Sequence, residues 1–134
     1  MPLGRKVAEE DICEADVVIY VISRISGEGK DRRKVKGDYY LSEREEEDLR
    51  YLAEMNKPVI LILNAGGPVE LTDILEQTDN IKGILNISQL GQEGGDALAD
   101  VLLGKEVPGG KLTTTWARRY EDYPASEEYG YLNG

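Results

Sequence analysis

A glutamate flanked by two glycines is the residue of this chain best placed to do chemistry. Gly27, Glu28 and Gly29 follow shortly after a run of apolar, mostly β-branched residues. Glycine lets the backbone approach a ligand closely, and a carboxylic acid whose pKa is raised by loss of water can act as a general acid near neutral pH. The residues by themselves also allow a solvent-exposed glutamate in a flexible loop, and composition alone favours this second interpretation.

The same segment is a poor match to the glycine-rich loops that bind nucleotides. A dinucleotide-binding fingerprint needs a third glycine at position 32, which is Arg32. A phosphate-binding loop needs Ser or Thr after its lysine, but Asp31 follows Lys30. In a second candidate loop, residues 104–109, Gly110 stands where the lysine belongs. A nucleotide-binding protein is therefore disfavoured.

Five of the sixteen basic residues lie within seven consecutive positions of an otherwise acidic chain. They are Lys30, Arg32, Arg33, Lys34 and Lys36. One interpretation is a small anion-binding patch. The favoured alternative is a solvated loop in which Asp31 or Asp38 pairs with a neighbouring arginine and fixes the shape of the loop.

Composition excludes several kinds of catalytic site and partner. The 134 residues include no histidine and one cysteine, so Ser-His-Asp triads, Cys-His nucleophiles, His-ligated zinc and an internal disulfide cannot be built from this chain. Cys13 is expected to pack inside the protein. The net charge of −10 argues against nucleic acid and anionic membranes as partners. The charged N-terminus and the lack of a run of about 18 apolar residues predict a cytoplasmic protein without a membrane span.

Strand and helix signals alternate along the chain. Ser42 and Glu45 form a capping box, which marks the start of a helix. The other patterns predict strands over 16–23, 59–63 and 83–87, a short edge strand over 111–116, and helices over 8–14, 43–56, from Pro68 onward, and from about 97 to 104. Residues 24–41 carry no periodicity, and an irregular stretch of that length is more often functional than a mere connector.

Apolar strands that alternate with helices are typical of a parallel sheet covered on both faces. The sequence therefore predicts an α/β fold, a three-layer sandwich with a mainly parallel sheet. Ligands of such sheets bind beyond the carboxyl ends of the strands. The loops 24–41, 64–68 and 88–95 follow those ends, and each contains glycine.

Four motifs, in their order and spacing, resemble a known family. They are residues 24–32 (Arg-Ile-Ser-Gly-Glu-Gly-Lys-Asp-Arg), 61–69, 91–104 and 108–113. Together they resemble the C-terminal α/β domain of glycoside hydrolase family 3, the β-glucosidase family, from about Ala15 to Tyr123. The resemblance implies that Glu28 is the acid/base residue, that Gly27, Gly29, Asp31 and Arg32 shape its loop, and that neither a metal nor an organic cofactor takes part.

The resemblance also implies that part of the enzyme is missing. In the family a (β/α)₈-like barrel carries the aspartate nucleophile, and no Asp here lies in a comparable motif. We therefore expect a carbohydrate substrate of the β-glucoside kind, a missing barrel partner, an inactive isolated chain, and a sheet truncated at its N-terminal side whose exposed edge favours self-association.

The expected organisation has three parts. Residues 1–14 form a short helix or an addition foreign to the natural protein, 15–117 form the sandwich, and 118–134 form an acidic tail. The tyrosines of that tail, which could stack on sugar rings or dock on a neighbour, are Tyr120, Tyr123, Tyr129 and Tyr131. A rival function is a non-catalytic carbohydrate-binding or interaction domain on the same fold.

Overall fold

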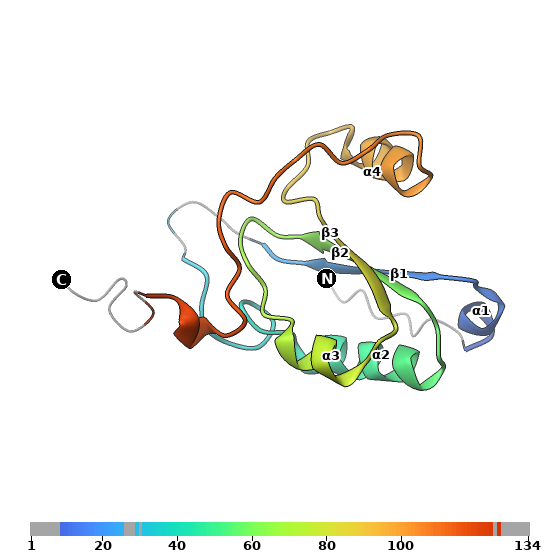
Figure 1. The fold of residues 1–134 in the computed structure, drawn as a ribbon, viewed down its shortest axis with the longest axis horizontal. Helices are drawn as coiled ribbons and strands as arrows, with labels where there is room; N and C mark the ends of the chain where they lie inside the picture. The colour runs from blue at the N-terminus through green and yellow to red at the C-terminus, as the bar shows by residue number, and fades with distance from the viewer. Residues whose placement is uncertain (1–8, 26–28, 30, 125, 127–134) are drawn as a thin grey trace.

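Three parallel strands form the centre of the molecule (Figure 1). They are β1 (Val18–Ser23), β2 (Val59–Asn64) and β3 (Ile81–Asn86), in the order β1-β2-β3. The structure is a computed structural model that describes residues 9–25, 29, 31–124 and 126. Both strand pairs are parallel, with Val21 opposite Ile62 and Ile62 opposite Leu85. The predicted parallel sheet is confirmed.

Helices lie on both sides of this sheet. The flanking helices are α2 (Glu43–Glu54), α3 (Thr72–Gln77) and α4 (Gly94–Leu102). A further helix, α1 (Glu9–Glu14), lies beyond the start of β1 (Figure 1), and a 3-10 turn, η1 (Tyr120–Asp122), follows near the C-terminus. Figure 1 shows α2 and α3 against one face and α4 on the opposite side. The arrangement confirms the α/β class and its three layers. No helix in the described part of the chain is long and apolar enough to cross a membrane.

The hydrophobic core lies between the sheet and the helices α2 and α3. Alternate side chains of the strands point into it, because successive residues of a strand face opposite sides. Its buried members include Ile22, Leu61 and Leu63 from the strands, Leu49 and Leu52 from α2, and Ile74 from α3. Helix α2 begins with the predicted capping box, in which Ser42 and Glu45 satisfy each other's backbone N–H groups.

The opposite face of the sheet is covered less completely. Ile62 on the central strand is fully buried there, but its neighbours on β1 are not. Ile19 and Val21 of β1 are 48% and 52% exposed, and Val17, just before the strand, is 43% exposed. β1 is an edge strand of the described sheet. Whether this edge pairs with another chain stays a prediction.

Three local predictions were wrong. Residues 111–116 form no strand, because the segment crosses the carboxyl edge of the sheet instead of running beside an edge strand (Figure 1). The helix expected from Pro68 begins at Thr72, because the preceding residues extend toward Tyr39 and Tyr40, with the Glu70 N–H donating to the Tyr39 carbonyl at 2.9 Å. Cys13 is exposed and does not pack in the core.

Candidate functional site

The carboxyl ends of β1 and β2 meet at one edge of the sheet. The side chain of Asn64 approaches Ser23 Oγ at 3.5 Å, and the N–H of Arg24 donates to the Asn64 carbonyl at 3.0 Å. Beyond this edge the chain enters residues 24–41, the segment predicted from the sequence to be irregular. Ligands of parallel α/β sheets bind at such edges, so the candidate site belongs here.

Of the five residues assigned to the site from sequence, three are described. Gly27 and Glu28 lie outside the described residues. Gly29 has a backbone φ of +73°, a left-handed conformation that glycine adopts without the steric cost of a side chain. Asp31 is exposed. The loop-shaping roles of Gly29 and Asp31 stay predictions.

Arg24 is the only buried charged or polar side chain in the described part of the chain, at 7% exposure. Its guanidinium forms a bidentate ion pair with Glu45, at 2.7 and 2.8 Å. It also donates to three backbone carbonyls, those of Ser23, Asp38 and Tyr40, at 2.9, 2.7 and 3.2 Å. A buried charge is tolerated when it is paired and fully hydrogen-bonded, and Arg24 meets both conditions.

Glu45 connects this arginine to the first turn of α2. Its Oε2 accepts hydrogen bonds from the N–H of Ser42 at 2.7 Å and from the Ser42 hydroxyl at 3.0 Å. Burial by itself would raise the pKa of Glu45, but the hydrogen bonds from Arg24 and Ser42 and the positive charge of Arg24 hold that pKa below its ordinary value. Glu45 is therefore an ionised carboxylate at neutral pH.

Arg32 is held by a second carboxylate. Its Nε donates to Asp38 Oδ1 at 2.8 Å, while its other nitrogens donate to the carbonyls of Pro68 at 2.6 Å and Asp38 at 2.5 Å. Asp38 Oδ2 accepts the backbone N–H of Arg33 at 2.7 Å. Burial favours a higher pKa for Asp38, but the Arg33 N–H and the Arg32 side chain lower it. The predicted pairing of an aspartate with a neighbouring arginine occurs at Asp38.

Two further basic residues of this segment are also paired. Lys34 forms an ion pair with Glu121 and lies 4.4 Å from the centre of the Tyr120 ring. Lys36 lies 3.2 Å from a carboxylate oxygen of Glu46. These pairings favour the interpretation of the basic run as a solvated loop stabilised by internal ion pairs over an anion-binding patch.

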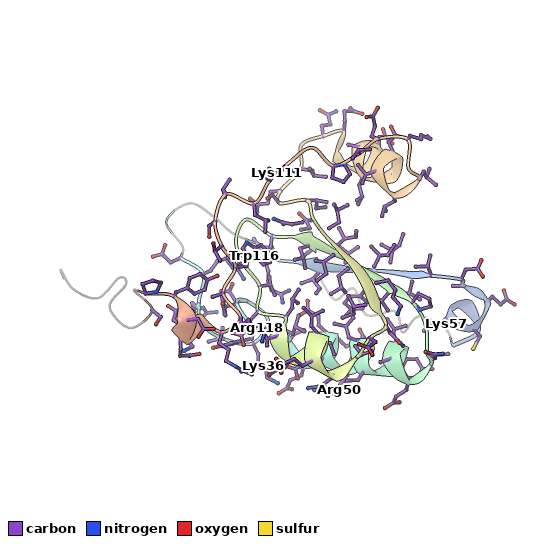
Figure 2. The ribbon with its side chains drawn as sticks, in the orientation of Figure 1. Lys36, Arg50, Lys57, Lys111, Trp116 and Arg118 are labelled. Atoms are coloured by element: carbon purple, nitrogen blue, oxygen red, sulfur yellow. The ribbon has the colours of Figure 1, made fainter. Side chains whose placement is uncertain are left out.

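The C-terminal segment returns to this loop. Figure 2 shows Trp116 and Arg118 along the stretch that leads from α4 to η1. The ring of Tyr120 packs edge-on against Tyr39 with centroids 5.3 Å apart, and the Tyr120 N–H donates to Glu70 at 3.1 Å. Tyr120 thus makes contacts within the protein through both its ring and its backbone N–H group. Tyr129 and Tyr131, also predicted to bind sugar, lie outside the described residues.

Sequence reasoning missed the role of Arg24 and the contact between the tail and the loop. A signal for Arg24 does exist: a charged residue stands right after an apolar strand, and Glu45 is part of a capping box that the sequence reveals. The tail contact has no local signal, because Lys34 and Glu121 are 87 positions apart. No group of three or more metal-ligating side chains occurs among the residues that the structure describes.

Comparison with known proteins identifies a family. The model of the glycosyl hydrolase family 3 C-terminal domain matches residues 4–133. Beta-glucosidase A of Butyrivibrio fibrisolvens is 39% identical over an alignment that covers 86% of this chain and 16% of that protein. The chain therefore spans about one-sixth of this relative.

Solved structures give the same result. Beta-glucosidase 3B from Thermotoga neapolitana, in complex with glucose, superposes with a TM-score of 0.80 at 45% identity, covering 91% of this chain and 17% of that one. A beta-glucosidase from Paenibacillus barengoltzii superposes with a TM-score of 0.86 at 30% identity, covering 97% of this chain and 14% of that one. The similarity therefore extends over most of the described fold.

Proposed function

Because the chain belongs to the glycosyl hydrolase family 3 C-terminal domain family, we propose that it is part of a retaining β-glucosidase-type enzyme and supplies Glu28 as its general acid/base. The observation that carries this proposal is the position of Glu28 in sequence. It stands five residues after the last residue of β1, beyond the sheet edge where α/β proteins bind ligands. Relatives of this chain are named beta-glucosidases, which agrees with a glycoside as substrate.

The proposed chemistry uses two carboxyl groups. A carboxylate from another part of the enzyme attacks the anomeric carbon, while protonated Glu28 gives its proton to the departing glycosidic oxygen as the C–O bond breaks. Ionised Glu28 then takes a proton from water, which attacks the anomeric carbon and releases the nucleophile. In retaining enzymes the two carboxyl groups lie about 5–5.5 Å apart.

Glu28 must hold its proton near neutral pH to act as an acid. Nearby positive charge opposes this, because it favours the ionised carboxylate. The arginines closest to Glu28 in sequence are Arg24 and Arg32, and each is paired with a carboxylate, Glu45 or Asp38. These pairings compensate the charges of the two arginines, so each opposes protonation of a neighbouring carboxyl group less than an unpaired arginine would.

We expect the isolated chain to be inactive. It spans 16% of one beta-glucosidase relative and 14% of another. We place the nucleophile in a barrel domain that these 134 residues do not contain. Without that barrel the covalent route is absent, and so are the contacts that would hold the sugar against Glu28.

The test is hydrolysis of a chromogenic aryl β-glucoside by this chain alone and by the chain combined with a barrel domain of the family, with Glu28 intact and as Glu28→Ala. Activity is expected only in the combination. Loss of the general acid/base should lower kcat by about 10²–10⁴-fold. As a matched control, Glu54→Ala removes an exposed glutamate at the C-terminal end of α2, outside the loops that follow the strands, and should leave the rate unchanged.

Each other outcome has a defined meaning. If the combination assembles but its activity is the same with Glu28→Ala, Glu28 is not the acid/base. If an assembled combination binds the glucoside and never hydrolyses it, the non-catalytic carbohydrate-binding domain replaces the enzyme as the function. Assembly is checked separately by size-exclusion chromatography.

A further inference from the structure

Two arginines lie at equal sequence distances from Glu28, four residues before it and four after it. Both donate to the same acceptor, the backbone carbonyl of Asp38: Arg24 through Nε at 2.7 Å and Arg32 through Nη2 at 2.5 Å. The two ends of the segment 25–31 are thereby tied to one point of the backbone. We call Arg24, Arg32 and Asp38 the arginine clamp.

The clamp is anchored to the rest of the fold on three sides. Arg24 pairs with Glu45 at the start of α2. Arg32 donates to the carbonyl of Pro68, in the connection between β2 and α3. Asp38 in turn binds Arg32 and the N–H of Arg33 through its two carboxylate oxygens. The base of the segment is therefore fixed relative to the sheet edge and to α2.

We propose that Arg24, Arg32 and Asp38 are positioning residues, which hold the ends of the Glu28 segment so that its carboxyl group meets the glycosidic oxygen. The inference rests on the proposed function of Glu28 and extends it to residues that do not touch the substrate. Misplacing a reacting group by about 1 Å can cost on the order of 10²-fold in rate, so a fixed base of the loop has catalytic value.

Lysine cannot replace either arginine in this geometry. A guanidinium presents donors in a planar fork, and Arg24 uses that fork for two carboxylate oxygens and three carbonyls. A lysine ammonium has three donors from a single atom and cannot span these acceptors. Arg24→Lys and Arg32→Lys therefore keep the charge while opening the clamp.

The decisive experiment measures how hydrolysis depends on the leaving group. It uses an assembled enzyme in which this chain replaces the matching segment of the Thermotoga neapolitana enzyme. Hydrolysis of alkyl β-glucosides needs an acid to protonate the leaving oxygen. Dinitrophenolate, by contrast, leaves a dinitrophenyl β-glucoside without being protonated. The clamp variants are Arg24→Lys, Arg32→Lys and Asp38→Ala. Each should lower kcat for the alkyl substrate by on the order of 10²-fold. Each should leave the rate at which the glycosyl intermediate forms from the dinitrophenyl substrate nearly unchanged.

A merely structural role gives a different result, since loss of folded enzyme lowers both rates equally. Equal loss on both substrates, or no loss on either, would overturn the proposal. The matched controls are Arg50→Lys, an arginine of α2 that pairs with Glu46 away from the clamp, and Asp100→Ala, which removes a pair with Lys105 (Figure 2 labels Arg50). Both controls should keep the leaving-group dependence of the parent enzyme.

Glu28→Ala in the same assay separates this inference from the proposed function. If Glu28→Ala shows the leaving-group dependence and the three clamp variants do not, Glu28 is the acid and the clamp is not needed. If Glu28→Ala itself lacks that dependence, the proposed function fails, whatever the clamp variants do.

A second readout on the 134-residue chain needs no activity. Hydrogen exchange of the backbone amides of Arg33 and Tyr39, which donate to the Asp38 carboxylate and to the Arg33 carbonyl, should become faster in Arg32→Lys, while exchange in α4 stays the same. Unchanged exchange at Arg33 and Tyr39 would contradict a clamp that fixes the base of this segment.

Discussion

The two faces of the sheet differ in how completely the other residues of this chain cover them. On the face toward α2 and α3, Leu61 and Leu63 are at most 1% exposed, and the Arg24–Glu45 pair closes the core next to the sheet edge. On the face toward α4, Ile19 and Val21 of β1 are about half exposed. Within β1 itself, Ile22 lies in the finished core at 0% exposure, whereas the adjacent Val21 lies on the open surface.

The difference shows which part of the molecule is fully packed by contacts within this chain. The finished face carries the clamp, the capped start of α2 and the tail contacts, so Arg24 and residues 32–41 are held in place by contacts within this chain. The open face contributes little burial, and hydrophobic stabilisation grows with the apolar area removed from water. The following predictions test this contrast, beginning with the largest effect.

Leu61→Ala should cause the largest loss of stability. Leu61 is fully buried in the core beneath β2, and such truncations lower the free energy of unfolding by about 2–5 kcal/mol through lost burial and the remaining cavity. Denaturant unfolding followed by circular dichroism measures the change. Ile19→Ala on the open face is the matched control, since Ile19 is already 48% exposed, and it should cost about 1 kcal/mol or less. Equal losses at the two positions would contradict the contrast between the faces.

Glu45→Ala should have the next largest effect, because it leaves Arg24 buried without its partner. Breaking a buried ion pair from one side costs about 3–5 kcal/mol when both groups are fully buried; Glu45 keeps 15% of its side chain exposed, so we expect the lower end of that range. Thermal and urea unfolding give the value. Glu46→Ala, which removes the solvent-accessible pairs with Arg50 and Lys36, should cost about 1 kcal/mol or less. A loss at position 45 no larger than at 46 would mean that the buried pair does not stabilise the loop.

Acid should weaken the finished face before it affects the open one. The pKa values of Glu45 and Asp38 lie below their ordinary values of 4.5 and 3.8 in the folded protein, so the two groups add stability at higher pH and lose it as the pH falls through their lowered pKa values. The midpoint of thermal unfolding should be constant from pH 7 to about 5 and fall below about pH 4. Glu45→Gln should weaken that fall, and an unchanged pH profile in this variant would exclude Glu45 as a source of the acid sensitivity.

Gly29→Ala should have the smallest of these effects. A residue with a side chain pays about 1–2 kcal/mol in the left-handed conformation that Gly29 adopts, and an exposed loop relieves part of that cost by local movement. We expect a loss of about 1 kcal/mol. Gly95→Ala in α4, at a position with open space and a negative φ, is the control and should not destabilise the chain. Equal destabilisation at both positions would argue against a conformational requirement at Gly29.

The sequence predicts the strands, the parallel sheet and α2 well, because their signals are local. Continuous apolar runs mark β1 and β2, and Ser42 with Glu45 marks the start of α2. The loop after β1 is predicted to be irregular because its residues show neither the strand nor the helix pattern. The pairing of Arg32 with Asp38 can also be predicted from the sequence, since the two residues are only six positions apart.

Other features depend on contacts between distant segments and leave no local signal. The start of α3 is delayed because Glu70 pairs with the backbone of Tyr39, a partner 31 positions earlier. Residues 111–116 have strand-forming side chains but no neighbouring edge to pair with. The shared acceptor of Arg24 and Arg32 is a backbone carbonyl, and every residue type has one, so the clamp has no sequence pattern.

The most direct measurement is azide rescue of Glu28→Ala in the assembled enzyme with an aryl β-glucoside that bears a good leaving group. Without its acid/base the enzyme should still form the glycosyl intermediate, and azide, a nucleophile that needs no general base, should restore turnover and yield the β-glycosyl azide. A product of the opposite anomeric configuration would identify Glu28 as the nucleophile, and the absence of any rescue in an assembled, substrate-binding enzyme would contradict its role as the acid/base.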